Sequence, residues 1–259
     1  MVKKRGASKI NLVSETNPFS AIAEQYRKIR TNIEFSSSDK KIKSLVITSA
    51  SSSEGKTTTA ANLAIVFAQA GNKVLLVDAD LRRPNVALGF EVPNVNDLSF
   101  KVPNINGLSN YLTEEKLADS TFLEEGSNKV QEQSTRLIET DTENLYLMPS
   151  GPTPPNPSEL LNSNRMRELV DNLSNSFDLV IFDMPPVVPV TDAQIMSAYV
   201  DGTILVARER VTAERTLLEA KKLLDMVRAK IIGVVYNGKK SGNNHYHYYG
   251  TKESKRVIE

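Results

Sequence analysis

Short apolar runs alternate along the chain with segments whose apolar residues recur at helical spacing. The runs are unbroken or nearly so, and they cover residues 44–48, 73–77, 145–148, 179–182, 202–207 and 231–236. Runs of this kind are typical of strands that are buried on both faces of a parallel sheet. Helical patterns follow several of them, at residues 60–67, 158–161, 166–173 and 213–227. The alternation predicts an α/β fold, a doubly wound and mostly parallel sheet in a single domain.

The two ends of the chain depart from this pattern and set the expected domain at residues 18–237. Residues 1–17 are polar and basic, and we expect them to be flexible. Residues 18–36 predict a helix, because apolar side chains recur there at i, i+4, i+7 and i+11. These side chains are Ile22, Tyr26, Ile29 and Ile33. Residues 238–259 are too polar to form a packed core and predict a flexible tail.

The pattern weakens between Pro84 and Pro149. Residues 92–99 recur as residues 102–109 with six of eight positions identical, which indicates a local duplication in a surface loop. Short helices are expected near residues 108–112 and 117–125. The polar stretch 126–142 predicts a further loop.

The composition restricts the possible chemistry and partners. The chain of 259 residues has no cysteine, so disulfides and thiolate metal sites are excluded. Its 32 basic and 31 acidic residues give a net charge of +1, and we expect no nucleic-acid partner. No apolar run approaches the roughly 18 residues that span a bilayer, and the N-terminus lacks a secretory signal. These features predict a cytoplasmic protein.

A Ser-rich loop after the first apolar run ends in Glu54-Gly55-Lys56-Thr57-Thr58. Where such a loop leads into a helix, its N–H groups and those of the first helical turn form a cradle for phosphate. Lys56 would reach the β- and γ-phosphates, and the Thr57 hydroxyl would hold Mg²⁺. The first Gly of the general pattern is replaced by Ala50. By itself the loop could therefore be an ordinary helix start.

Acidic residues at the ends of two apolar runs support a phosphate site. Asp78 and Asp80 are two residues apart at a strand end, so both point to the same face. Two neighbouring carboxylates facing phosphates are best explained by a divalent cation between them. Asp183 ends a later run, as expected for the acidic residue of a Walker B site. A turn aspartate is the alternative at each position.

Two further clusters have both a functional and a plain explanation. Glu24, Arg27 and Arg30 fall away from the apolar stripe of the first helix; they form either an interaction surface or a solvated face with a local ion pair. The tail carries three tyrosines close together, Tyr246, Tyr248 and Tyr249. Exposed aromatic residues in a polar segment suggest a role, although such a tail can also carry them without one. His245 and His247 could bind a metal weakly.

In combination, these motifs resemble the bacterial tyrosine kinases, or BY-kinases, of capsular and exopolysaccharide synthesis. The resemblance extends from about Pro18 to the tyrosine tail. It rests on EQYRKIR at 24–30, EGKT at 54–57, LVDADLRRP at 76–84, PNPSELL at 155–161, IFDMPP at 181–186 and the tyrosine cluster.

The resemblance implies a P-loop NTPase-like fold and an ATP-dependent protein-tyrosine kinase. In this family Lys56 and Asp80 would be catalytic, with Asp80 orienting or deprotonating the phenol. Mg²⁺ would be held by Thr57, Asp78 and Asp183. The residues expected to bind ATP are Ser53, Glu54, Gly55, Lys56, Thr57 and Thr58, with Asn237 at the adenine. Ser52 and Ser53 stand where relatives often have Pro-Gly, and a positive φ at Ser53 would strain a residue that has a Cβ.

The resemblance also implies partners. Tyr246, Tyr248 and Tyr249 would be phosphorylated by a neighbouring subunit of a homo-oligomeric ring, which Glu24, Arg27 and Arg30 would hold together. A membrane adaptor would recruit and activate the kinase at the inner face of the membrane, and a tyrosine phosphatase would oppose it.

Two other functions compete with this interpretation. A partitioning or septum-positioning ATPase shares the loop and the second strand, but such proteins have a Lys where this chain has Ser51, and they lack the tyrosine tail. A non-catalytic scaffold that binds nucleotide only to assemble would not need the paired carboxylates Asp78 and Asp80.

Overall fold

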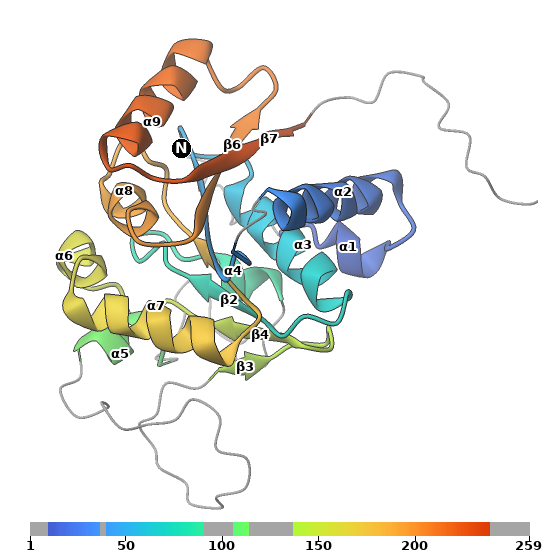
Figure 1. Ribbon diagram of the computed structural model, residues 1–259, viewed down its shortest axis with the longest axis horizontal. Helices are drawn as coiled ribbons and strands as arrows, with labels where there is room; N and C mark the ends of the chain where they lie inside the picture. The colour runs from blue at the N-terminus through green and yellow to red at the C-terminus, as the bar shows by residue number, and fades with distance from the viewer. Residues whose placement is uncertain (1–9, 37–39, 91–105, 114–136, 239–259) are drawn as a thin grey trace, which may run out of the picture.

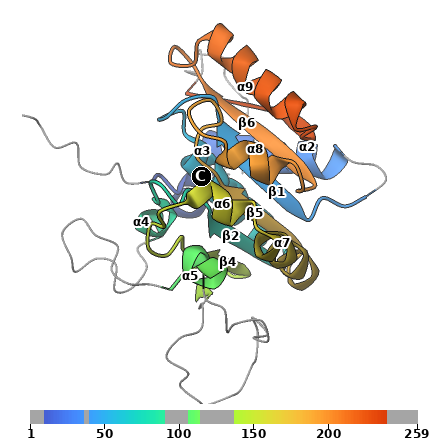
Figure 2. The same ribbon diagram turned by 90° about the vertical axis from the view of Figure 1, so that its left-hand side faces the viewer.

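A seven-stranded sheet forms the centre of the computed structural model, which describes residues 10–36, 40–90, 106–113 and 137–238. The strand order is β3-β4-β2-β5-β1-β6-β7. In Figure 2 the strands β6, β1, β5, β2 and β4 follow one another from top to bottom, which is the same order read from its other end. The β3–β4 pair is antiparallel, and the other described pairs are parallel. The strands are β1 (Ser44–Ser49), β2 (Val74–Asp78), β3 (Ile138–Glu139), β4 (Leu145–Met148), β5 (Leu179–Asp183), β6 (Gly202–Arg208) and β7 (Ile231–Asn237).

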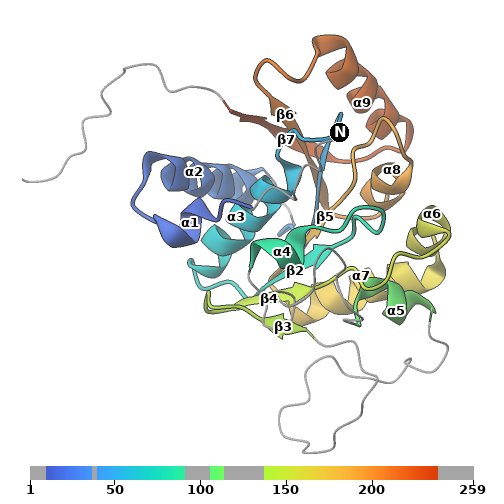
Figure 3. The same ribbon diagram turned by 180° about the vertical axis from the view of Figure 1, so that it is seen from behind.

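Helices cover both faces of the sheet, which confirms the doubly wound α/β prediction (Figures 1 and 3). One face carries α1 (Val13–Thr16), α2 (Ala21–Phe35), α3 (Lys56–Ala68) and α4 (Val86–Gly89). The other carries α5 (Leu108–Thr113), α6 (Pro157–Leu161), α7 (Asn164–Ser176), α8 (Asp192–Ser197) and α9 (Glu214–Met226). No helix in the described ranges is both long and apolar enough to cross a bilayer.

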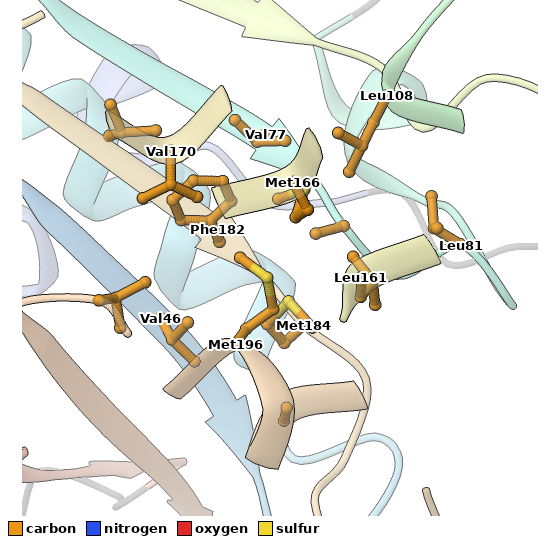
Figure 4. Packing of buried hydrophobic residues seen from close by; sticks show 14 of the residues in the cluster. Val46, Val77, Leu81, Leu108, Leu161, Met166, Val170, Phe182, Met184 and Met196 are labelled. Carbon is orange, nitrogen blue, oxygen red and sulfur yellow. The ribbon is translucent and has the colours of Figure 1, made fainter. Parts of the chain in front are cut away.

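Alternation along the strands divides the core into two halves. In β1, Leu45 and Ile47 pack on the α3 side, whereas Val46 packs toward α7 and α8. Figure 4 shows Val46 and Phe182 of the sheet close to Met166 and Val170 of α7 and to Met196 of α8. Every position of β1, β2 and β5 is buried, which explains the unbroken apolar run in the middle of each strand.

The first helix differs from its predicted packing. Ile22 is 57% exposed, and Ala23 is fully buried in its place, so the apolar stripe is wrong at its first position. Tyr26 and Ile33 are buried as expected. The helix begins at Ala21 after Ser20, whose hydroxyl accepts a hydrogen bond from Ala23 N. A narrow face of α2 packs on α3, and a small residue permits close approach there.

Residues 10–17 belong to the fold, so the expectation of a flexible segment is wrong for them. Ile10 and Leu12 are buried, and α1 follows them in the sequence, before α2 begins. The backbone of Ser14 donates to Asn62 Oδ1 on α3, which ties the segment to the phosphate-loop helix. The expected helix at 117–125 and residues 1–9 lie outside the described residues.

Candidate active site

The Ser-rich loop connects β1 to α3 and ends at Gly55, whose φ is +95°. A Cβ at Gly55 would lie 2.0 Å from Nδ2 of Asn237, so this close approach requires glycine. The amide of Asn237 donates to the Glu54 carbonyl at 3.1 Å. The end of β7 therefore supports the phosphate loop from behind.

Ser53 adopts the left-handed conformation that its place in the loop predicts, with φ of +65°. Arg208, the last residue of β6, donates from Nη1 to the Ser53 carbonyl at 2.9 Å. This contact helps to hold a backbone conformation that is unfavourable for a residue with a Cβ.

The Glu54 carboxylate braces the loop instead of facing the cleft. The side chain is fully buried. Its Oε2 accepts from Ser51 N at 2.9 Å, and its Oε1 accepts from the Thr212 hydroxyl. Of the expected ATP-binding residues, Ser53, Gly55, Lys56, Thr57 and Thr58 line the cleft, whereas Glu54 and Asn237 do not and bond to each other instead.

Lys56 lies among the three predicted aspartates, as the sequence spacing requires. Its Nζ is 3.0 Å from Asp80 Oδ2 and 3.8 Å from Asp183 Oδ1. Burial on its own would lower the pKa of Lys56, but the charges of Asp183 and Asp80 outweigh it and raise that pKa. Lys56 therefore remains an ammonium group that can bind an anion.

Asp78 is buried at the end of β2, where it pairs in register with Asp183 of β5. Its Oδ2 accepts from the backbone N–H groups of Asn85 and Val86, at 3.0 and 2.9 Å. Within the described part of the chain, its Oδ1 has no hydrogen-bond partner. Burial, followed by the charge of Asp183, raises the pKa of Asp78 to about 8.

Asp183 is the most poorly satisfied carboxylate of the site. Both of its oxygens are buried, and neither accepts a well-formed hydrogen bond from the residues that the structure describes. Burial raises its pKa, and the charge of Lys56 and a contact with the Thr57 hydroxyl offset part of that effect. Unsatisfied carboxylate oxygens on Asp78 and Asp183 fit a divalent cation, which prefers oxygen ligands. The described residues contain no group of three or more His, Cys, Asp or Glu suited to a metal, so phosphates, a hydroxyl and water would complete the shell.

The phosphate loop, Lys56 and Asp80 line one cleft of about 650 Å³, whereas Asp78 and Asp183 are buried beneath it and do not line it. Besides the phosphate loop and Asp80, its walls include Ile10, Arg82, Arg83, Asn85, Pro185, Pro186, Pro189, Val190 and Arg208. The sequence indicated no role for Arg82 or Arg208, because their partners lie far away in the chain. The cleft can hold phosphates beside a lysine and a carboxylate, which is the arrangement that phosphoryl transfer needs.

Glu24, Arg27 and Arg30 lie on α2, outside this cleft. Arg27 donates from Nε to Glu24 Oε2 at 2.8 Å and from Nη1 to the Pro18 carbonyl at 2.9 Å. Arg30 Nη1 donates to the Val66 carbonyl of α3 at 2.9 Å, so Arg30 also holds α2 to α3. Tyr246, Tyr248 and Tyr249 lie outside the described residues.

Comparison with known proteins assigns the family. Residues 42–229 match the AAA domain family, to which the chain therefore belongs. The tyrosine-protein kinase YwqD of Bacillus subtilis is 42% identical over 254 residues, which cover 97% of each protein. This chain belongs to the bacterial tyrosine kinases. The kinase is also 36% identical to the putative tyrosine-protein kinase CapB of Staphylococcus aureus, over 90% of this chain and 92% of CapB.

Solved structures agree with this assignment. The kinase domain of the Escherichia coli tyrosine kinase ETK matches the kinase with a TM-score of 0.73 at 30% identity, over 96% of this chain and 89% of that domain. The MinD protein of Pyrococcus horikoshii, complexed with Mg-ADP, matches with a TM-score of 0.54 at 22% identity. The likeness to MinD extends to the P-loop NTPase fold alone.

Proposed function

We propose that this nucleotide-binding tyrosine kinase uses ATP and Mg²⁺ to phosphorylate Tyr246, Tyr248 and Tyr249 in the tail of a neighbouring subunit. The observation that carries the proposal is the Lys56–Asp80 ion pair, at 3.0 Å, beside the unsatisfied carboxylates of Asp78 and Asp183. It joins a phosphate-binding cation and a base in one cleft, next to a buried pair of carboxylates that could bind a metal. The family membership supplies tyrosine as the acceptor.

Each residue has a role that follows from its position. Lys56 would leave Asp80 and bind the β- and γ-phosphates, and the freed Asp80 carboxylate would accept a hydrogen bond from the phenol. Thr57, Asp78 and Asp183 would hold Mg²⁺, which neutralises charge on the phosphates. The bond from the phenol oxygen to the γ-phosphorus forms as the bond to ADP breaks, and the phenol proton passes to Asp80. Because the transition state is loose, positioning and charge matter more than prior deprotonation.

We propose further that the kinase works within a capsule or exopolysaccharide system. The names of the relatives support this, since one is CapB and another, in Klebsiella pneumoniae, is a putative tyrosine-protein kinase in a cps region. A solved relative is the chimeric protein CapA2B2. A membrane adaptor would recruit the kinase to the inner face of the membrane, an opposing phosphatase would reset it, and Glu24, Arg27 and Arg30 would assemble the ring.

Mapping of phosphotyrosine tests the central proposal. Wild-type protein incubated with ATP and Mg²⁺ is expected to acquire phosphate on the tail tyrosines, whereas Lys56→Met and Asp80→Asn are expected to acquire none. Asp80→Asn should still bind ATP, because it removes a negative charge near the phosphates. Mass spectrometry of tryptic peptides and nucleotide titration provide the two measurements. Wild-type protein that released ADP but labelled no tyrosine, even with its activator, would refute tyrosine as the acceptor.

A further inference from the structure

The buried carboxylate of Asp192, which lies outside the phosphate site, binds the side chain of Arg82, two residues after Asp80. Asp192 is fully buried at the start of α8. Its Oδ2 accepts from Arg82 Nε at 2.8 Å and its Oδ1 from Arg82 Nη2 at 3.0 Å. The Ser158 hydroxyl donates to the same Oδ1 at 2.7 Å and accepts from Arg82 Nη2 at 2.8 Å. All three side chains are thus bonded to one another.

These three residues join segments that are distant in the chain. Arg82 follows β2, Ser158 is the second residue of α6, and Asp192 is the first residue of α8. Ser158 and Asp192 lie 76 and 110 residues from Arg82. Ser158 belongs to the PNPSELL segment at 155–161, for which neither the cleft nor the phosphate loop supplies a role. A two-pronged guanidinium–carboxylate contact fixes orientation as well as distance.

The anchored arginine is connected to Asp80 through the backbone. Asp80 Oδ1 accepts from the Arg83 N–H at 3.0 Å, while Oδ2 pairs with Lys56. Arg83 follows Arg82 directly, so the position of the Arg82 side chain sets the turn at residues 80–83. One carboxylate oxygen of Asp80 is thereby held even when Lys56 moves to the nucleotide.

The same contact fixes another wall of the cleft. Pro189 and Val190 line the cleft and lie three and two residues before Asp192. Arg82 lines the cleft as well. The loop from β5 to α8 and the turn after β2 are therefore held together at the wall of the cleft that lies outside the phosphate loop.

We infer that Arg82, Ser158 and Asp192 form a positioning cluster that holds the Asp80 carboxylate for the acceptor without binding nucleotide. This inference rests on the proposed function, because it assigns Asp80 to the acceptor. The cluster acts on the orientation of a catalytic group, so its loss lowers kcat and leaves the affinity for ATP unchanged. Loss of orientation in an active site can cost up to about a hundredfold in rate.

Conservative variants of the cluster test the inference. Ser158→Ala removes both bonds of the hydroxyl, and Arg82→Lys keeps the charge but loses the two-pronged contact. We expect each to lower kcat by roughly tenfold or more, with KM for ATP within about twofold of wild type. Ser158→Thr retains a hydroxyl and is expected to restore most of kcat. Lys221→Gln breaks an exposed ion pair with Asp225 on α9 and serves as the matched control, with unchanged kcat.

Two products are measured in every sample, ADP and phosphotyrosine, together with the melting temperature. Wild type that forms ADP without phosphotyrosine refutes tyrosine as the acceptor, yet the variants still report on the cluster through their rate of ADP formation. Unchanged kcat in both Ser158→Ala and Arg82→Lys overturns the positioning role. A parallel loss of kcat, ATP affinity and melting temperature, with no rescue by Ser158→Thr, overturns it too, since that pattern belongs to a purely structural cluster.

Discussion

At the scale of single residues, the site combines strain and unsatisfied charge that surrounding contacts hold in place. Ser53 keeps a positive φ through the bond from Arg208, and Lys56 is shared between Asp80 and Asp183. Backbone strain and unpaired charges of this kind are typical of functional sites, where a bound ligand can pair with the charges. Phosphates would bind the Lys56 ammonium group in place of the aspartates, and a cation would bind the carboxylates of Asp78 and Asp183.

The raised pKa of Asp78 gives the first prediction at this scale. Its pKa is about 8 in the folded protein against about 3.8 for a free carboxyl, so folding takes up a proton between these values. Without metal, the stability contributed by this group is therefore present at low pH and is lost as pH rises toward 8. The loss is at most about 1.4 kcal/mol per pH unit. Denaturant unfolding of nucleotide-free protein from pH 5 to 8 measures this slope.

Matched variants identify the group responsible. Asp78→Asn is expected to flatten the slope between about pH 5 and 8. Asp178→Asn is the control, because a backbone hydrogen bond from Lys73 lowers the pKa of Asp178, so its effect is confined to acid. A slope that persists unchanged in Asp78→Asn would assign the pH dependence to another group.

At the scale of elements, the strands were predictable and the short or distant features were not. The strands β1, β2 and β5 are buried on both faces, and each of their sequences, SLVITS, VLLVD and LVIFD, contains an unbroken apolar run that ends in polar residues at the site. The two-residue strand β3 and the short helix α8 escaped prediction, because elements of this length have no measurable period. Arg82 escaped it as well, since its partners are determined by the packing of α6 and α8.

The segment at residues 10–17 is ordered although its sequence is polar, because the buried side chain of Asn62 bonds to its backbone. Asn62 of α3 accepts from Ser14 N at 2.8 Å and donates to the carbonyls of Asn11 and Thr58, at 2.8 and 2.9 Å. These bonds satisfy the backbone of a segment that its composition alone would leave disordered. The residues that precede α2 are thereby fixed to the helix that begins at Lys56.

We predict that Asn62→Ala detaches this segment. The substitution leaves the buried backbone N–H of Ser14 without its partner and removes the bond to the carbonyl of Asn11, an exposed residue. A buried group left unpaired costs about 1 to 3 kcal/mol, so we expect a loss of that size in the free energy of unfolding and faster hydrogen exchange at Ser14. Gln69→Ala is the control, because exposed Gln69 makes a single bond to the Ser14 carbonyl. Equal losses in the two variants would contradict the assignment to Asn62.

At the scale of the whole molecule, the strand order places the aspartates of the site next to one another, and α2 lies away from them. β2 and β5 are neighbours, so Asp78 and Asp183 meet at their carboxyl ends, as expected for a parallel sheet. α2 lies outside α3 on one face of the molecule (Figure 1). Two large apolar side chains near its start are exposed, Phe19 at 84% and Ile22 at 57%. They lie beside Glu24 and Arg27, which strengthens the expectation of a subunit contact there.

The last prediction separates assembly from folding on this surface. Arg30 bonds to Val66 of its own subunit, so Arg30→Ala would disturb both. Arg27 pairs with partly exposed Glu24 and donates to the Pro18 carbonyl just before α2; both contacts are local to the start of α2, and exposed ion pairs contribute little to folding. Arg27→Ala is therefore expected to reduce the assembled mass in solution while the melting temperature changes little. Light scattering and thermal unfolding provide the two measurements.

A loss of assembly should also slow phosphorylation if the tail is modified by a neighbouring subunit. In Arg27→Ala the rate per subunit is expected to rise with protein concentration, because encounters between subunits then limit transfer, whereas assembled wild type should be nearly independent of it. Arg215→Ala, at an exposed position of α9, controls for the loss of a surface arginine. An unchanged assembled mass in Arg27→Ala would contradict a subunit contact and would favour the alternative, a solvated face with a local ion pair between Glu24 and Arg27. A reduced mass with a rate independent of concentration would show that each subunit phosphorylates its own tail.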